Sequence, residues 1–398
     1  MVDRYRETSR RRRRRAERSN QRLDIQGLRT VAVLAVVAHH LWGWPRGGSV
    51  GIDVFFVVSG FLVTGSLLLT SKHAGTPSLT EFYWNRVRRI LPAAAVVLLG
   101  TCVASLLILT PARARDTLVD ALFAFAGVAN WHATAGDSPV AHFWALSIAE
   151  QFYVVWPLLI LAVGALVARE RTRAVAVTAA VVVAASFAWA LYREAPLDTL
   201  TRVWELGVGA LLATAAAQLS RIPQPTKPLL SWAGVLLIGA SLALAGDTAA
   251  WALLPVAGTA LVLAAGVGGE SGFQPLLCNR VSTYVGDLSY PLYLAHWPVI
   301  VLVGALMERS PYFYVCVLAF TFGVAVACHH FVENPSRHAS RDAFRQAIKD
   351  MERGLFHVER RTKAAAVGAL VLIAVGLCAF AARPDAYEPT QQPVTQGL

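Results

Sequence analysis

The sequence predicts an all-α membrane protein, a polytopic bundle of about eleven transmembrane helices. Hydrophobic residues make up 56% of the 398 residues and charged residues only 15%, whereas soluble domains carry about 25% charged residues. A chain so poor in charge must hide most of its surface from water, and a lipid bilayer does this. The apolar residues also gather into stretches of about 20, the length that crosses the hydrocarbon core as a helix.

Eleven such stretches follow one another along the chain. A shorter, amphipathic stretch at 116–131 is predicted to lie at the membrane interface. We expect the first ten spans to form a core and the eleventh to be an addition to it. The predicted spans are 28–46, 50–70, 91–110, 143–168, 174–192, 199–217, 230–247, 250–268, 284–306, 311–332 and 364–383.

These spans divide the chain into five segments. They are a basic N-terminal tail at 1–27, a membrane domain at 28–338, a basic loop at 339–363, the eleventh helix at 364–383 and a short tail at 384–398.

The basic residues support this count and predict an orientation, because cytoplasmic loops are enriched in Lys and Arg. With the N-terminus in the cytoplasm, alternating sides place 28 of the 36 Lys and Arg in cytoplasmic segments and 6 in extracytoplasmic ones. The other two, Arg29 and Arg202, lie in or at the edge of spans. We therefore expect a multi-pass protein of the cell (inner) membrane with its C-terminus outside.

The composition also argues against two other classes of site. The arginines at 11–15 belong to a basic block directly before the first span, so they are predicted to anchor the chain to lipid headgroups and not to bind nucleic acid. The five cysteines are scattered through apolar stretches without a CxxC or other ligand spacing. This pattern predicts neither a disulfide framework nor a metal site, and no resident cofactor is expected.

Ionisable residues at membrane depth are costly and are therefore candidates for function. In the first span Arg29 and His40 are eleven residues apart, about three helical turns plus 20°, so both lie on one face. The helical rise separates them by about 16 Å along the axis, and this face can contact a long substrate at two depths. His39 points about 100° away and is expected to hydrogen-bond a neighbouring helix.

Two motifs follow in the next spans. Asp53 lies in the first turn of the second span, where a carboxylate either favours the helix dipole or orients a histidine. Ser59 and Gly60 allow a neighbouring helix or an acyl chain to approach closely. Arg86 and Arg89 are at i, i+3 and share a helix face. The planar guanidinium binds phosphate bidentately, so this pair predicts a phosphate site, with lipid anchoring as the alternative.

The fourth and sixth spans each contain two ionisable residues. His142 lies at the outer edge of the fourth span, and Glu150 lies eight residues further into it. A carboxylate at that depth is expected to have a function. Arg202 and Glu205 are at i, i+3 in the sixth span. They form either a structural salt bridge or part of an acceptor site.

The ninth span, GDLSYPLYLAHWP, carries His296 near its middle. Pro291 and Pro298 break or kink this helix, and the carbonyl groups that they free need partners. His296 is either such a partner or a member of the site. The predicted sides place the arginines Arg29, Arg86 and Arg89 toward the cytoplasm, where phosphate is available, and the acid–base groups in the outer half.

Together these motifs resemble the acyltransferase-3 family of membrane-bound O-acyltransferases, over about residues 21–338. The resemblance is carried by RLDIQGLRTVAVLAVVAHH, GIDVFFVVSGFLVTG, the RxxR at Arg86–Arg89, HFWALSIAEQFYVVWP, RVWELGVGALL, LSYPLYLAHWPV and VENP at 332–335.

The resemblance implies an enzyme that transfers an acetyl or other short acyl group from an acyl-CoA, expected to be acetyl-CoA, to a hydroxyl of a carbohydrate. It implies that His40 is the essential histidine and that Arg29, Arg86 and Arg89 serve donor binding or catalysis. The family often has SVEEQFY where this chain has SIAEQFY, with Ala149 in place of the first glutamate. Any role of that carboxylate is then absent or has passed to Glu150.

Many members of the family continue from the eleventh span into an extracytoplasmic SGNH domain. The present sequence has fifteen residues after 383. A separate SGNH-type protein completes the transfer, or the membrane domain acts alone, or the sequence is a truncated form; all three stay open.

The hypothesis for the mechanism is that His40 is a general base on the acceptor hydroxyl, with Glu150 or Asp53 fixing its tautomer. A covalent acyl-His40 intermediate is a variant. The acceptor is a cell-envelope glycan, with a lipid headgroup or a secondary metabolite such as a macrolide as alternatives. A proton-coupled secondary transporter is the alternative from another class, but the halves show no repeat and a transporter has no need of the cytoplasmic arginine pair.

Overall fold

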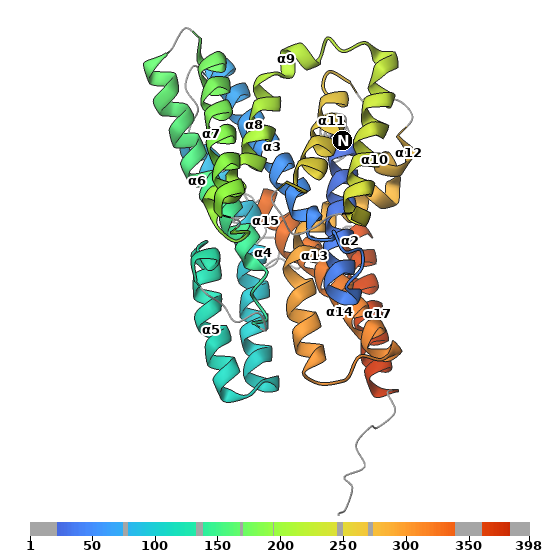
Figure 1. The fold of residues 1–398 in the computed structure, drawn as a ribbon. Helices are drawn as coiled ribbons and strands as arrows, with labels where there is room; N and C mark the ends of the chain where they lie inside the picture. The colour runs from blue at the N-terminus through green and yellow to red at the C-terminus, as the bar shows by residue number, and fades with distance from the viewer. Residues whose placement is uncertain are drawn as a thin grey trace, which may run out of the picture.

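The structure, a computed structural model, describes residues 22–74, 79–132, 138–167, 170–193, 195–244, 250–269, 274–338 and 360–382. Within these ranges the secondary structure is helical, with no strand (Figure 1). The all-α prediction is confirmed. Most of the basic tail at 1–27 and of the loop at 339–363, and the whole tail at 384–398, lie outside the described residues.

The long helices lie beside one another as a bundle (Figure 1). Their bounds are α2 Leu23–Trp42, α3 Val50–Ala74, α4 Leu79–Ile108, α5 Pro111–Phe125, α6 Phe143–Leu166, α7 Arg171–Arg193, α8 Thr199–Thr214, α10 Lys227–Leu244, α11 Leu253–Ala265, α13 Arg280–Gly304, α14 Pro311–Cys328 and α17 Arg360–Ala381. Short helices α9 Ala216–Leu219, α12 Pro275–Cys278 and α15 Asn334–His338 lie in the connections or at helix ends.

Eight described helices are long and apolar enough to cross a membrane. The other three predicted spans correspond to α8, α11 and α13. Of these, α8 has 16 residues and α11 has 13, fewer than the roughly 20 that a straight crossing needs. The chain is therefore a multi-pass membrane protein, and the number of eleven crossings stays a prediction.

The segment predicted as one amphipathic helix over 116–131 has different bounds. Helix α5 begins five residues earlier at Pro111, a residue that favours the first helical position because it needs no N–H partner there. It ends before Gly127, whose φ of 71° closes the helix. Ala121 and Ala124 of α5 pack on α4, beside which α5 lies (Figure 1).

Glycines set the closest helix contacts. A Cβ on Gly60 of α3 would lie 1.8 Å from the Leu206 carbonyl oxygen of α8, and one on Gly209 would lie 2.0 Å from the Val57 carbonyl oxygen. The prediction that Gly60 admits a neighbouring helix is confirmed. Similarly, a Cβ on Gly286 of α13 would lie 2.1 Å from the Gln26 carbonyl oxygen of α2, so α2 and α13 also meet closely.

The core lies where α2, α3, α6, α8 and α13 meet. Helix α17 packs chiefly against α14, at one edge of the bundle (Figure 1). The thiol of Cys316 on α14 donates to the Gly376 carbonyl of α17 at 3.3 Å. The eleventh predicted span thus lies at the edge of the bundle, and its residues Ala365 and Ala369 still belong to the main core cluster.

Candidate active site

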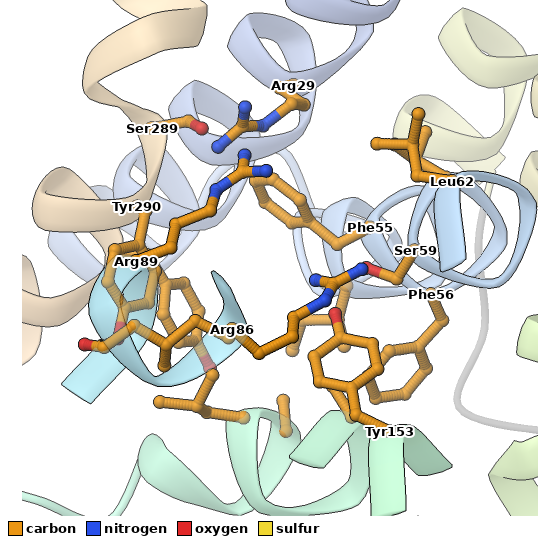
Figure 2. A pocket seen from close by; sticks show the side chains of 17 residues that line it. Arg29, Phe55, Phe56, Ser59, Leu62, Arg86, Arg89, Tyr153, Ser289 and Tyr290 are labelled. Atoms are coloured by element: carbon orange, nitrogen blue, oxygen red, sulfur yellow. Dashed lines mark hydrogen bonds between the residues drawn. The ribbon is translucent and has the colours of Figure 1, made fainter. Parts of the chain in front are cut away.

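A cavity of about 130 Å³ enters the core between α2, α3, α4, α6 and α13. Three arginine side chains line it, and Figure 2 shows their guanidinium groups turned toward the same space. Aromatic and aliphatic side chains make up most of the remaining wall: Ile52, Phe55, Phe56, Val58, Leu62, Ile90, Ala145, Leu146, Ala149, Tyr153, Tyr290 and Tyr293. A cationic region joined to an apolar one suits a ligand that has a phosphate part and an acyl part.

The arginines are Arg29 of α2 and Arg86 and Arg89 of α4, so the structure brings together the three residues predicted to hold the donor. The i, i+3 spacing places Arg86 and Arg89 on the face of α4 that meets the core. Arg86 lies over the Tyr153 ring at 4.3 Å. The third member of the arginine run, Arg88, donates instead to Asn85 on its own helix and does not line the cavity.

The charge of this cationic region is only partly balanced. Arg29 is 8% exposed, and its Nη1 donates to Oε1 of Gln26, a neutral partner, at 3.2 Å. Among the described residues, neither Arg86 nor Arg89 forms an ion pair with a carboxylate. Unpaired cations in a partly dry cavity favour an anionic ligand, because burying like charges together is costly without one.

One carboxylate, Glu333, lies close enough to interact electrostatically with both Arg29 and Arg89. It is 1% exposed and accepts hydrogen bonds from His329 Nδ1 at 2.9 Å and from Arg337. Glu333 ends a π-helical turn over His329–Glu333, and such turns often occur at functional sites. Glu333 belongs to the VENP motif, but no role was predicted for it, since the π turn that orients it has no clear signal in a single sequence.

Three histidines form a second cluster, in contact with the wall of the cavity. Nδ1 of His40 and Nε2 of His296 are 3.0 Å apart. The ring of His142 stands edge-on to that of His296, with the ring centres 5.2 Å apart. His40, His142 and His296 were singled out separately in three different spans, and the structure brings all three together.

Tyr293 of α13 joins the cavity to this cluster, and the sequence analysis missed it. Its side chain lines the cavity, and its hydroxyl donates to the His142 carbonyl at 2.6 Å. Its own carbonyl accepts from His296 Nδ1 at 2.6 Å. Ser289, Tyr293 and His296 recur at i, i+4 and i+7, a helical periodicity of polar groups that offered the one available signal.

Pro298 explains how His142 is held. Proline has no N–H, so the Leu294 carbonyl four residues earlier lacks its helical donor. His142 Nε2 donates to that carbonyl at 3.2 Å. The sequence predicted that a carbonyl freed by proline would need a partner, with His296 as the candidate. The residue that bonds the freed Leu294 carbonyl is instead His142. The neighbouring His39 donates through Nδ1 to the Pro45 carbonyl at 2.9 Å. Its partner therefore lies in the loop after its own helix, and not on a neighbouring helix as predicted.

Asp53 belongs to a separate buried ion cluster. Arg202 Nη1 donates to Asp53 Oδ1 at 3.0 Å and to Glu205 Oε1 at 2.7 Å. The salt bridge of Arg202 with Glu205 is confirmed, and Asp53 is its third member. The hypothesis that Asp53 fixes the tautomer of His40 is wrong, because the Asp53 carboxylate faces α8 and the hydrogen bond of His40 goes to His296.

Glu150 is also not the partner of the His40 nitrogen. Its carboxylate is half-buried beside the turn at Gly127, where a Cβ would lie 2.8 Å from Glu150 Oε2. The adjacent Gln151 ties this region together by donating to the Gly127 carbonyl at 2.9 Å. Glu150 therefore does not orient His40 through Nδ1, and any other role of Glu150 stays a prediction. Ala149, in contrast, lines the cavity.

The fold and site thus define a polytopic helical membrane protein in which Tyr293 lies between an arginine-lined cavity and a histidine cluster. The acyltransferase-3 family, described as an acyltransferase domain, matches residues 22–330, and the chain belongs to this family. The resemblance deduced from the motifs is confirmed.

Several relatives of known classification are similar to the chain. YrhL of Bacillus subtilis is 30% identical over 358 residues, which are 81% of this chain and 56% of YrhL. The peptidoglycan O-acetyltransferase OatA of Listeria monocytogenes is 28% identical, over 82% of this chain and 57% of OatA. OatA of Staphylococcus aureus is 27% identical, over 80% and 58%. The chain therefore spans little more than half the length of these relatives. No solved structure matches it significantly.

Proposed function

We propose that this chain transfers an acetyl or other short acyl group from acyl-CoA to a hydroxyl group of a cell-envelope glycan. One observation carries the proposal: three arginines converge on a cavity whose wall includes Tyr293, the residue that contacts the histidine cluster. The family supplies the class of reaction. Relatives named as peptidoglycan O-acetyltransferases support a glycan as acceptor.

Arg29, Arg86 and Arg89 would hold the phosphate groups of the donor. Guanidinium groups bind phosphate oxygens with two parallel hydrogen bonds, and such charge-assisted bonds are about twice as strong as neutral ones. The pantetheine arm and the acyl group would follow the apolar wall toward Tyr293. The separation of about 16 Å along α2 between Arg29 and His40 suits a donor that extends from one to the other.

His40 would act as the general base. Its free ring nitrogen takes the proton of the acceptor hydroxyl while that oxygen attacks the thioester carbonyl. The carbon–sulfur bond then breaks, and the CoA thiolate takes up the proton, so that CoA and the O-acyl product leave and the imidazole is neutral again. Attack by the His40 nitrogen itself, with an acyl-imidazole intermediate, is the variant that single-turnover trapping would detect.

The predicted orientation fits this scheme. A cytoplasmic N-terminus places the arginine end of the cavity on the side where acyl-CoA is made, and the glycan acceptor is on the other side. A separate SGNH-type protein would act after this chain if the acyl group is passed on before it reaches the glycan.

The test uses the purified full-length protein in lipid nanodiscs with acetyl-CoA and soluble peptidoglycan fragments. CoA release is followed by thiol detection, and acetylated fragments by mass spectrometry. We expect CoA release that depends on the fragments and yields an O-acetyl ester. Donor turnover that depends instead on a macrolide or on a lipid headgroup would overturn the glycan as acceptor. Absence of turnover with every acceptor, in protein that binds acetyl-CoA, would overturn the transferase.

A further inference from the structure

The hydrogen bond between His40 and His296 determines which ring nitrogen of His40 is free to accept a proton. We propose that His296 is a positioning residue, which holds His40 in the tautomer that leaves Nε2 of His40 free as the base. This inference rests on the proposed function and adds a residue that acts through another residue, without contact to the substrate.

The first step is the hydrogen bond at Tyr293. A backbone carbonyl can only accept, so the Tyr293 carbonyl at 2.6 Å requires a proton on Nδ1 of His296. A neutral imidazole has one N–H, and its other nitrogen carries a lone pair. Nε2 of His296 is therefore an acceptor.

The acceptor at Nε2 of His296 then fixes the position of the proton on His40, which belongs to α2. His296 Nε2 is 3.0 Å from His40 Nδ1, and since the former is an acceptor, the latter must be the donor. The proton of neutral His40 is then on Nδ1, and its lone pair is on Nε2. Among the described residues, the ring of His40 has no other hydrogen-bond partner, so Nε2 is free to take a proton from a substrate.

The third step concerns the charge that appears during the reaction. When Nε2 of His40 gains a proton, the Nδ1–H bond to His296 becomes charge-assisted and stronger. The proton on Nδ1 of His40 can also shift to Nε2 of His296, so two rings share one charge. No carboxylate among the described residues hydrogen-bonds either ring. The aromatic groups that face the two rings are His39, His142, Tyr293 and Trp297. His296 therefore takes the place that a carboxylate holds in the serine-protease type of triad.

The surrounding contacts hold this chain of hydrogen bonds in place. The Tyr293 hydroxyl is bonded to the His142 carbonyl at 2.6 Å, and His142 Nε2 is bonded to the Leu294 carbonyl at 3.2 Å. Two bonds, one from the Tyr293 hydroxyl and one to the Leu294 carbonyl, thus join α13 to His142, the residue before α6. Gly286 brings α13 against α2. The distance between the two rings is consequently set by helix packing on both sides.

Two amide variants of His296 separate the loss of the hydrogen-bond acceptor at Nε2 from the loss of the imidazole ring itself. The terminal amide of glutamine reaches about as far as Nε2 of histidine, so His296→Gln can present an oxygen to the His40 Nδ1–H group. The amide of asparagine reaches only as far as Nδ1, so His296→Asn can bond the Tyr293 carbonyl but leaves His40 without an acceptor. Neither amide can take up a proton at neutral pH.

Both variants and the wild type are compared in nanodiscs by kcat and KM for acetyl-CoA. We expect His296→Asn to lower kcat by about 10²- to 10⁴-fold, the range for loss of an oriented general base, with KM within about twofold. His296→Gln should retain kcat to within about tenfold. Equal loss in both variants, or a wild-type kcat in His296→Asn, would overturn the role of the acceptor.

The tautomer itself is measured on the wild type by nitrogen-15 NMR of histidine-labelled protein, with His40→Gln used to assign the signal. We expect a protonated Nδ1 and an unprotonated Nε2 at His40. A His40 signal with the proton on Nε2 would overturn the inference even if the variants fail to fold. This measurement needs no turnover, so failure of the proposed reaction and failure of this inference are distinguishable.

Discussion

Nδ1 of His40 and Nε2 of His296 lie 3.0 Å apart, although 256 residues of sequence separate them. The contact joins α2, which carries Arg29, to α13, which carries Tyr293. The two ends of the site are therefore connected through the pairing of these two helices. Changes at the arginines and at the histidines are expected to alter different steps, binding and chemistry respectively.

Replacement of Arg89 by glutamine should weaken donor binding. Arg89 lines the cavity and forms no ion pair among the described residues, whereas Arg88 donates to Asn85 on its own helix. Loss of one charge-assisted contact costs about 1.5–3 kcal/mol, so KM for acetyl-CoA should rise by about 10- to 100-fold. Arg88→Gln is the matched control and should keep the wild-type KM. An equal rise in both variants would show that general positive charge, and not the cavity, attracts the donor.

Replacement of Ala149 by glutamate should also weaken donor binding, for the opposite reason. Residue 149 lines the cavity together with the three arginines, so a carboxylate there is expected to compete with phosphate for them. At an effective dielectric constant of about 20, one charge at about 10 Å is worth between 1 and 2 kcal/mol, or about a tenfold rise in KM. Ala149→Gln has the same length without the charge and isolates the electrostatic part. A lower KM in Ala149→Glu than in Ala149→Gln would contradict this assignment of the cavity.

Replacement of Arg202 by methionine should lower stability. Arg202 is the cation between Asp53 and Glu205, and Glu205 is 0% exposed. Removal of one partner of a buried ion pair costs about 3–5 kcal/mol, because the other charge stays buried without compensation. Thermal unfolding in detergent measures this loss. Arg193→Met, at an exposed position on α7, is the control. Equal melting temperatures for the two variants would mean that the cluster does not stabilise the fold.

Two glycines of α3 should respond in opposite ways to alanine. At Gly60 a Cβ would meet the Leu206 backbone at 1.8 Å, whereas at Gly65 nothing lies within 4 Å. Gly60→Ala must push α8 away and should lower the melting temperature clearly. Gly65→Ala should raise stability by up to about 1 kcal/mol through helix propensity. The same direction of change in both variants would contradict the packing of α3 on α8.

Much of the fold could be predicted from the sequence because the bilayer imposes a strong local pattern. Each span was predicted from its own apolar run alone. Helices α3 and α14 begin at the predicted residues, whereas α2 runs from 23 to 42 and the predicted span was 28–46. The short helices α8 and α11 and the proline-containing α13 are weaker cases, since their position depends on the helices around them. The predicted ends of α5 were wrong for two reasons. Pro111, which starts the helix, lies before the predicted segment 116–131, and Gly127, which ends it, lies inside that segment.

The candidate site was predictable where one helix carries the information. Arg29 with His40, and Arg86 with Arg89, each share a face of a single helix, and periodicity alone finds them. The partners of Asp53 and His40 were not predictable in this way, because they depend on which helix lies next to α2 and α3. Glu333 is oriented by a π turn. Tyr293 acts partly through its backbone carbonyl, and since every residue has a backbone carbonyl, the residue type gives no sign of this role.

The most direct test of the central claim is the rate of CoA release by His40→Ala compared with the wild type, at saturating acetyl-CoA and acceptor. We predict a loss of at least about 10²-fold, with binding of acetyl-CoA retained because the arginines are intact. His39→Asn, which can still donate to the Pro45 carbonyl, should stay close to the wild-type rate. Turnover at the wild-type rate by His40→Ala would contradict the assignment of His40 as the base.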